Sequence, residues 1–382
     1  MQLEEKKKYF KELSKKIDHD YFDFLTLIHR RYSMYQAQMI LKAYRFAEEH
    51  HRNQKRKCGS PYITHPLSVS YILAEVGFDY KTICSALLHD VVEDTPCTLN
   101  EIKEEFDEEV AILVDGVTKM KGSDFNSKEE SVIATHKKIL NSITIDARII
   151  AIKLSDRLHN MFTLEYLSER KQKEIASETK DFYVNLARIV GSYQVKDELQ
   201  DLCLYTLNKE KFLEIYELRQ DLKRKYAEEF HYIGGTTKEK LNSHNVLMDY
   251  NIKIKNSGAI YDEMLRGNKT SEIDDLLALR MLVENVGDCY KTLGVVHETC
   301  RSVKSGFCDY IASPKYNGYM SLNTNVLYND SNFQVRIRTN DMQKSNELGI
   351  ISTWTKETQQ VLSKKCDEMF EANKKELKRK GF

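Results

Sequence analysis

Residues 86–95 read ALLHDVVEDT, an apolar run that gives way to His89 and Asp90 and then to Glu93 and Asp94. If this segment is a single helix, residues four apart share a face, so His89 lies over Glu93 and Asp90 over Asp94. Four side chains able to bind a metal or carry protons then lie at one end of a buried helix. A buried charge without a partner costs free energy. The segment therefore favours a metal or substrate here, although a His-Asp pair alone is more often structural.

Two further segments supply residues of the same chemistry. His65 precedes Pro66, which suits the first turn of a helix, and Asp156 follows the apolar run 149–154. Two imidazoles and two carboxylates suit manganese, iron or zinc better than calcium or magnesium. The candidate ligands are His65, His89, Asp90 and Asp156. A bound metal activates water near neutral pH, and Glu93 and Asp94 can orient that water or move its proton.

Cations lie in the same segments as the candidate ligands, namely Arg56, Lys57, Lys153 and Arg157. Guanidinium and ammonium groups at such a site would hold an anionic substrate, and with a metal they would favour phosphoester hydrolysis. The competing interpretation has satisfied core histidines, acids that cap helices and a solvated charge run. The residues alone leave both interpretations open.

Composition limits the class of protein. The chain has 382 residues, of which 41% are hydrophobic and 30% charged, which is typical of a globular protein of two or three domains. Its formal net charge of zero argues against a dedicated nucleic-acid binder. The eight cysteines form no Cys-x-x-Cys pair, and no signal-like or long apolar segment is seen. We therefore expect a cytoplasmic protein with no membrane or nucleic-acid partner.

Hydrophobic periodicity predicts a multi-domain α plus α/β fold. Helical spacing dominates up to about residue 230, with continuous helices over 80–92 and 99–121 and a buried helix at 149–154. Strands are expected at 275–283, 321–327 and 333–337, and Gly234-Gly235 is expected to form a turn. We expect domains at 1–205 and 235–358, a helical linker at 206–234 and a charged C-terminal helix at 359–382.

Four separated segments carry a resemblance to the HD-type hydrolase domain of the RelA/SpoT homologue family. They read RKCGSPYITHP (56–66), ALLHDVVEDT (86–95), VDGVTK (114–119) and IKLSDRLHNM (152–161). The resemblance implies an all-helical domain that binds manganese through the four ligands, with Glu93 and Asp94 acting on the attacking water. It implies that Arg56 packs on a guanine and that the nucleotide lies among Lys57, Lys153, Arg157, Asn160 and Thr163. The implied reaction removes pyrophosphate from the 3′ position of guanosine tetra- or pentaphosphate, the stringent-response alarmones, to give GDP or GTP.

The second domain resembles the family's nucleotidyltransferase-like synthetase domain. The segments are DLLALR (275–280), FCDYI (307–311), PKYNGY (314–319) and VRIRT (335–339). In this family the domain moves pyrophosphate from ATP to GDP or GTP with magnesium, and Asp275 matches one of its carboxylates. Gln334 stands where the family has a catalytic glutamate, and Gly306 and Cys308 replace two phosphate-binding cations. The matching positions that retain their chemistry are Lys253, Lys255 and Tyr319. These losses predict an inactive synthetase, with Mg²⁺ required only if the domain were active.

The resemblance therefore favours a manganese-dependent alarmone hydrolase. A bifunctional synthetase/hydrolase and a non-catalytic alarmone-binding regulator stay open as alternatives, and similar small hydrolases act on other nucleotides such as NADPH. The expected partner is a guanine nucleotide alarmone. The chain has no length for ribosome-sensing domains, so control by the ribosome is not expected, and its oligomeric state is open.

Overall fold

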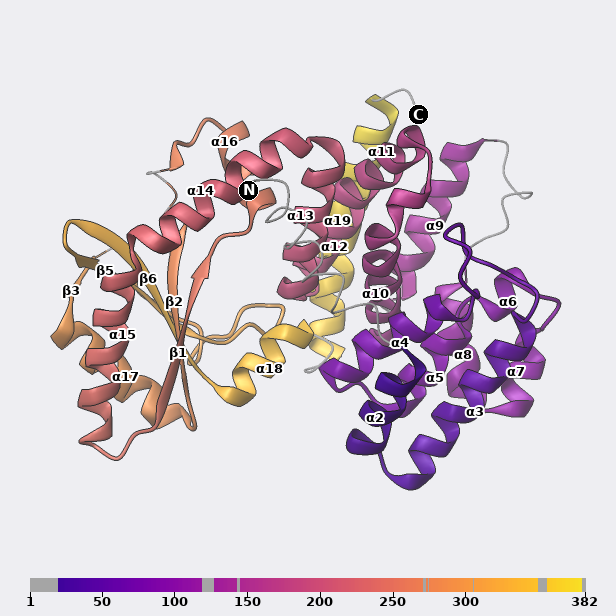
Figure 1. The fold of residues 1–382 in the computed structure, drawn as a ribbon, viewed down its shortest axis with the longest axis horizontal. Coiled ribbons are helices and arrows are strands. Elements are labelled where there is room, and N and C mark those ends of the chain that lie inside the picture. The colour runs from indigo at the N-terminus through magenta and orange to yellow at the C-terminus, as the bar shows by residue number, and fades with distance from the viewer. Residues whose placement is uncertain are drawn as a thin grey trace. The chain divides into compact units, whose positions relative to one another are not determined.

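The computed structural model describes residues 20–118, 127–142, 145–270, 273, 275–304, 306–349 and 356–379 (Figure 1). These residues form two compact units. Unit 1 contains the described residues up to Ile189 together with the C-terminal helix, and unit 2 runs from Val190 to Gly349. The units divide at Ile189, whereas the sequence placed the end of the first domain at residue 205.

Unit 1 is built mainly from helices, with an isolated β-bridge between Lys55 and Pro61 in the loop before α4. Its helices are α2 (Tyr21–Arg31), α3 (Met34–His50), α4 (Thr64–Val76), α5 (Tyr80–Leu88), α6 (Val91–Asp94), α7 (Leu99–Glu105), α8 (Glu108–Val117), α9 (Lys128–Ser142), α10 (Arg148–Phe162), α11 (Glu169–Glu178), α12 (Val184–Ile189) and α19 (Lys356–Arg379). A π-helical turn, Thr179–Tyr183, joins α11 to α12. The apolar run 149–154 lies inside α10 and is buried, so the predicted buried helix is confirmed there.

The helix expected over residues 80–92 is interrupted. Helix α5 ends at Leu88, His89 and Asp90 form a turn, and α6 begins at Val91. The backbone stays close to helical values, with φ −60° and ψ −32° at His89 and φ −96° and ψ −9° at Asp90. The prediction of one continuous helix was therefore wrong, and the turn falls on the two residues with candidate ligand chemistry.

The helix expected over 99–121 is also divided. Phe106 ends α7, and the Asp107 carboxylate accepts a hydrogen bond of 2.8 Å from the backbone N–H of Val110, which caps α8. An aspartate side chain in this position satisfies an otherwise unpaired N–H and favours a new helix start. Residues 119–121 of the expected helix lie outside the described residues.

Unit 2 contains a mixed sheet with helices. Its strands are β1 (Met248–Ile254), β2 (Leu277–Val283), β3 (Arg301–Ser302), β4 (Cys308–Asp309), β5 (Leu322–Tyr328) and β6 (Ser331–Thr339), in the order β1-β2-β6-β5-β3, with β4 pairing with β5. β2 and β6 are parallel, and the other pairs are antiparallel. The helices are α13 (Tyr193–Leu207), α14 (Lys209–Lys225), α15 (Ala227–Asn242), α16 (Ser257–Leu265), α17 (Val286–Thr299) and α18 (Asn340–Leu348). The expected α/β character of this part is confirmed.

One face of the sheet is covered by α15 and α17. Phe230 of α15 contacts Phe333 with their ring centroids 5.2 Å apart, and His297 of α17 lies 2.9 Å from the Thr324 hydroxyl. The turn expected at Gly234-Gly235 is absent, because α15 runs through both residues. A Cβ at Gly234 would lie 2.5 Å from the ring of Tyr250, so this glycine allows the helix to approach β1 closely.

Candidate metal centre and nucleotide pocket

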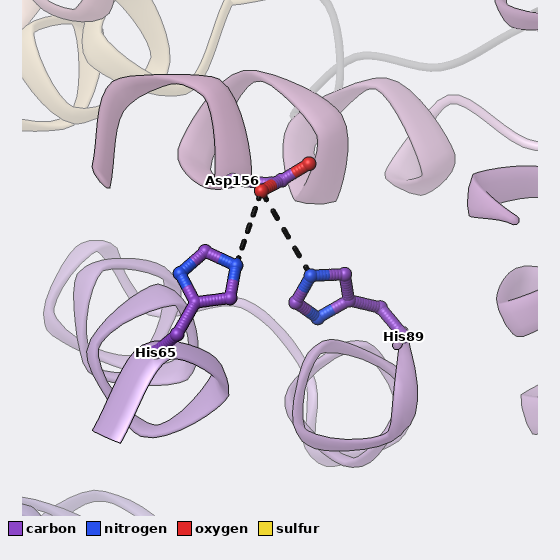
Figure 2. Close-up of side chains that lie close together, drawn as sticks. All are labelled: His65, His89 and Asp156. Atoms are coloured by element: carbon purple, nitrogen blue, oxygen red, sulfur yellow. Dashed lines mark ion pairs between the residues drawn. The ribbon is translucent and has the colours of Figure 1, made fainter. Parts of the chain in front are cut away.

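Three helical segments bring the four candidate ligands together in unit 1. His65 lies in the first turn of α4, His89 and Asp90 form the turn between α5 and α6, and Asp156 lies in α10. Figure 2 shows both imidazole rings directed at the Asp156 carboxylate. All four side chains are buried, with residue exposures of 2%, 1%, 7% and 8% in chain order.

Potential ligand atoms of His65, His89 and Asp156 all lie within 4.8 Å of one another. His65 Nε2 is 3.2 Å from Asp156 Oδ1, and His89 Nε2 is 3.9 Å from the same oxygen. Asp90 lies beside them, with Oδ1 at 3.2 Å from His89 Nε2 and Oδ2 at 3.6 Å from His65 Nε2. Two imidazole nitrogens and two carboxylates thus surround one small volume, which is a donor set for a divalent transition metal.

The orientation of His89 identifies which atoms face this volume. His89 Nδ1 is 2.8 Å from the carbonyl oxygen of Ala86. A carbonyl only accepts, so Nδ1 carries the hydrogen, and in the neutral ring Nε2 presents a lone pair. Among the described residues Nε2 is buried without a hydrogen-bond partner, and it faces the carboxylates of Asp90 and Asp156. A lone pair directed at two carboxylates is stabilised by a cation between them, so these residues fit a metal ion.

The electrostatics of the cluster keep the imidazole of His65 neutral and the carboxylate of Asp156 ionised. Burial lowers the pKa of His65, although the hydrogen bond with Asp156 opposes this. Burial alone would raise the pKa of Asp156, but the nearby Lys153 charge and the contacts with His65 and His89 hold it well below its usual value. A neutral imidazole and an ionised carboxylate are the forms that bind metals.

Neighbouring side chains hold the ligands in place. His65 Nδ1 lies 2.8 Å from Nδ1 of His159, which is buried in α10. Asn160 Nδ2 donates to Asp156 Oδ1 at 2.6 Å, and Lys153 Nζ lies 3.4 Å from Asp156 Oδ2. These contacts are of the kind that orient metal ligands and set their tautomers.

The two candidate catalytic acids lie in α6, next to the ligand cluster. Glu93 is half-buried and Asp94 is exposed. The Tyr62 hydroxyl lies 2.8 Å from both Asp90 Oδ2 and Asp94 Oδ2, so one phenol connects a candidate ligand to a candidate proton acceptor. Burial and both carboxylates raise the pKa of Tyr62, which keeps it protonated as a donor.

A cavity of about 650 Å³ borders the cluster, with Asp156 in its wall. All six residues that the sequence predicted around the nucleotide line it: Arg56, Lys57, Lys153, Arg157, Asn160 and Thr163. Arg56 Nη2 donates to the Thr163 hydroxyl at 3.0 Å, and Arg157 lies over the Tyr183 ring at 3.9 Å. The volume and the clustered cations suit a nucleotide with several phosphates.

Comparison with known proteins identifies both parts of the chain. Residues 43–192 match the family model for the HD domain, and residues 252–360 match the model for the region found in RelA/SpoT proteins. The chain belongs to the RelA/SpoT family. It is 40% identical over 319 residues to the GTP pyrophosphokinase of Streptomyces coelicolor, which covers 83% of this chain and 37% of that protein.

Relatives with other names in the RelA/SpoT family are similar to the same degree. The guanosine-3′,5′-bis(diphosphate) 3′-pyrophosphohydrolase of Aquifex aeolicus is 38% identical over 83% of this chain and 46% of its own length. The bifunctional (p)ppGpp synthase/hydrolase SpoT of Escherichia coli is 36% identical over 84% of this chain and 46% of its own length. The chain thus spans less than half the length of these relatives, which are named as a pyrophosphokinase, a pyrophosphohydrolase and a bifunctional synthase/hydrolase. No helix among the described residues has the length and apolar character to span a membrane.

The RelA/SpoT region of unit 2 contains the five residues predicted as a degenerate synthetase site, namely Lys253, Lys255, Asp275, Tyr319 and Gln334. Lys253 pairs with Ala278 and Ala278 with Gln334, so Lys253 and Gln334 lie in one row across β1, β2 and β6. Asp275 is 2.5 Å from Lys255 Nζ and 3.7 Å from Arg336 Nη2. Arg336 also donates to the Gln334 side-chain oxygen at 2.5 Å. Tyr319 is buried and accepts from Arg338 at 3.1 Å.

Sequence reasoning did not assign several residues that touch these sites. In unit 1 they are Tyr62, His136, His159 and Glu178; in unit 2 they are Arg336 and Arg338. Tyr62 and His159 lie inside the motifs that were recognised, three residues from the predicted ligands His65 and Asp156. His159 lies one helical turn after Asp156 in α10, and that spacing is the signal that could have found it. Tyr62 lies in the turn before α4, where helical spacing gives no such signal.

Proposed function

We propose that the protein hydrolyses guanosine 3′,5′-bis(diphosphate) to GDP and pyrophosphate, and the pentaphosphate to GTP, with manganese held by His65, His89, Asp90 and Asp156. The observation that carries this proposal is the buried Nε2 of His89, which faces two carboxylates without a hydrogen-bond donor among the described residues. The adjoining cation-lined cavity supports a phosphorylated substrate.

The metal, when bound, supplies a Lewis acid that lowers the pKa of water and stabilises charge on a phosphoryl oxygen. The protein's own groups supply the remaining parts of the reaction. Glu93 and Asp94 orient the attacking water, and one of the two carboxylates takes up its proton; Tyr62 holds Asp94 toward the ligand cluster through its 2.8 Å hydrogen bond. The water oxygen bonds to the phosphorus attached to the ribose 3′ oxygen. The P–O3′ bond then breaks, pyrophosphate leaves and the 3′ oxygen takes up a proton.

The cavity residues bind and orient the nucleotide in this proposal. The Arg56 guanidinium packs on the guanine and is held by Thr163. Lys57 and Arg157 attract the phosphates, and Arg157 lies over the Tyr183 ring. Holding the 3′ diphosphate next to Asp156 turns hydrolysis into a reaction between positioned groups.

The test is product analysis with purified protein. Guanosine tetraphosphate incubated with Mn²⁺ should yield GDP and pyrophosphate in equal amounts, and chelation should stop the reaction. Asp90→Ala should abolish both Mn²⁺ binding and hydrolysis, whereas Glu104→Gln, an exposed change on α7, should alter neither. Hydrolysis that persists in Asp90→Ala without Mn²⁺ would refute the metal mechanism. A panel including NADPH measures the breadth of substrates.

We further propose that unit 2 does not synthesise the alarmone. Gln334 cannot accept a hydroxyl proton and is a poor magnesium ligand, and its oxygen is already hydrogen-bonded to Arg336. Asp275 is paired with Lys255 and Arg336. Incubation with ATP, GDP and Mg²⁺ should give no tetraphosphate in Asp90→Ala, in which any product would accumulate. Formation of tetraphosphate there would show a bifunctional enzyme, as the name of the Escherichia coli relative indicates for that protein.

A further inference from the structure

The C-terminal helix α19 contributes a polar residue to the interior of unit 1. Leu362 and Cys366 are buried on one stripe of this helix, and Asn373 is buried further along it with 8% exposure. The helix packs against α9 and α12. A buried amide in a helix interface is unfavourable unless it is hydrogen-bonded, and a single such residue often fixes how helices align. The residue that hydrogen-bonds to Asn373 therefore indicates why an amide is buried at this position of α19.

Asn373 begins a line of contacts that ends in the nucleotide pocket. Asn373 Nδ2 lies 3.3 Å from His136 Nδ1 on α9, and His136 Nε2 lies 3.1 Å from Glu178 Oε1. Glu178 Oε2 in turn accepts from Arg157 Nη1 at 3.0 Å. Glu178 and Arg157 both line the pocket. The helix that follows unit 2 in the chain is thus connected to a pocket cation through three successive contacts.

Donors and acceptors match along this line. The Asn373 amide donates to His136 Nδ1, the Nε2–H of His136 donates to Glu178, and Glu178 accepts from Arg157 through its other oxygen. The His136 ring is stacked on Phe182, with centroids 3.7 Å apart and an interplanar angle of 1°. Because stacking on Phe182 and the hydrogen bond with Asn373 restrict the ring of His136, its Nε2 stays directed at Glu178.

The guanidinium at the end of the line is also restrained. Arg157 lies over the ring of Tyr183, in the π-helical turn that also carries Phe182. Burial would raise the pKa of Glu178, but the charge of Arg157 and the hydrogen bond from His136 lower it to about 2, so Glu178 stays ionised and keeps its hold on Arg157. π-helical turns often occur at functional sites, where they redirect side chains.

We propose that Asn373, His136 and Glu178 are positioning residues for Arg157, so that helix α19 fixes the direction in which this guanidinium meets the substrate phosphates. The inference rests on the proposed function for the role of Arg157. It assigns the helix after unit 2 a part in substrate binding by unit 1, through hydrogen bonds rather than through contact with the substrate. The orientation of an arginine decides whether two of its N–H groups meet one phosphate.

The test is a double-mutant cycle. Asn373→Leu removes the donor but keeps an apolar shape suited to the stripe, and it should raise KM for guanosine tetraphosphate about fivefold, as expected for one net hydrogen bond. The value of kcat should change less than twofold. In an Arg157→Ala background the same change should leave KM unaltered within about 1.5-fold, because coupled residues are not additive. Lys375→Ala, an exposed change on the same helix, is the control and should leave KM unchanged.

Equal effects of Asn373→Leu in both backgrounds, or no effect in either, would overturn the proposal. If Asn373→Leu does not fold, Glu178→Gln replaces it in the same cycle. The cycle is repeated with the dissociation constant of GDP, measured by calorimetry without turnover. If the effects of Asn373→Leu and Arg157→Ala on GDP affinity are coupled, but the protein does not hydrolyse the tetraphosphate, the proposed function alone is rejected. If the protein hydrolyses the tetraphosphate, but the two substitutions are uncoupled in both KM and GDP affinity, the positioning role alone is rejected.

Discussion

Replacing His159 tests the support of the metal centre most directly. When His65 presents its Nε2 lone pair to a metal, its Nδ1 must carry the hydrogen, and the acceptor 2.8 Å away is His159 Nδ1. His159→Phe keeps the ring but leaves a buried N–H on His65, which is 2% exposed, without its acceptor. An unsatisfied buried donor costs about 1–3 kcal/mol. Each factor of ten is about 1.4 kcal/mol, so Mn²⁺ affinity should fall roughly 5- to 150-fold.

The assay is Mn²⁺ binding by calorimetry or electron paramagnetic resonance, which needs no substrate. His159→Asn is the matched control, because its side-chain oxygen can occupy the place of Nδ1 and accept the same hydrogen bond. We expect His159→Asn to retain affinity within about threefold, well short of the 10- to 100-fold loss typical when the partner of a ligand is removed. A folded His159→Phe protein that binds Mn²⁺ as tightly as the unaltered protein would show that the contact does not orient the ligand.

Three further predictions concern other sites. Tyr62→Phe removes a hydrogen bond to charged groups worth about 1.5–3 kcal/mol, so kcat should fall roughly 10- to 150-fold in steady-state assays while KM stays within twofold. Glu178 has a folded pKa of about 2, below its ordinary value of 4.5, so its ionised form stabilises the fold above pH 4.5 and this contribution is lost as the pH falls toward 2. Glu178→Gln should therefore remove up to about 3 kcal/mol of acid-dependent change in unfolding free energy, measured by urea titration at each pH; equal pH dependence in both proteins would contradict it. Gln334→Glu, made in the Asp90→Ala protein so that any product accumulates, should not yield tetraphosphate from ATP and GDP by nucleotide chromatography, because Gly306 and Cys308 still lack cationic side chains; product would show that the glutamine is the only obstacle.

Much of the helical unit could be predicted from periodicity, but two helix breaks could not. The breaks at His89-Asp90 and Phe106-Asp107 lie within apolar patterns that continue across them. Neither break contains proline or glycine, the residues that usually interrupt helices. Successive residues on a helix point about 100° apart, and the backbone at His89 and Asp90 stays close to helical values although the regular helix stops there. Helix α5 ends at Leu88, and the turn formed by His89 and Asp90 brings both ligand side chains to the cluster before α6 begins at Val91.

The turn predicted from two glycines in unit 2 was wrong. The pair Gly234-Gly235 indicated a turn, yet α15 continues through it because the missing side chain at Gly234 makes room for Tyr250. Such packing depends on β1, whose position the local sequence does not specify. The charged C-terminal helix likewise gave no indication that Asn373 would be buried against His136. Contacts between residues far apart in the chain decide both features.

The discontinuity of unit 1 has a consequence for how the protein is made. Its last helix, α19, follows all of unit 2 in the sequence. Synthesis at about 5–20 residues per second would separate emergence of α12 from that of α19 by roughly ten to thirty seconds. During that interval the surface that receives Leu362 and Cys366 has no partner, so the nascent unit exposes apolar side chains while unit 2 is still being translated. The nascent chain should therefore gain its full protease resistance in unit 1 only after unit 2 has been completed.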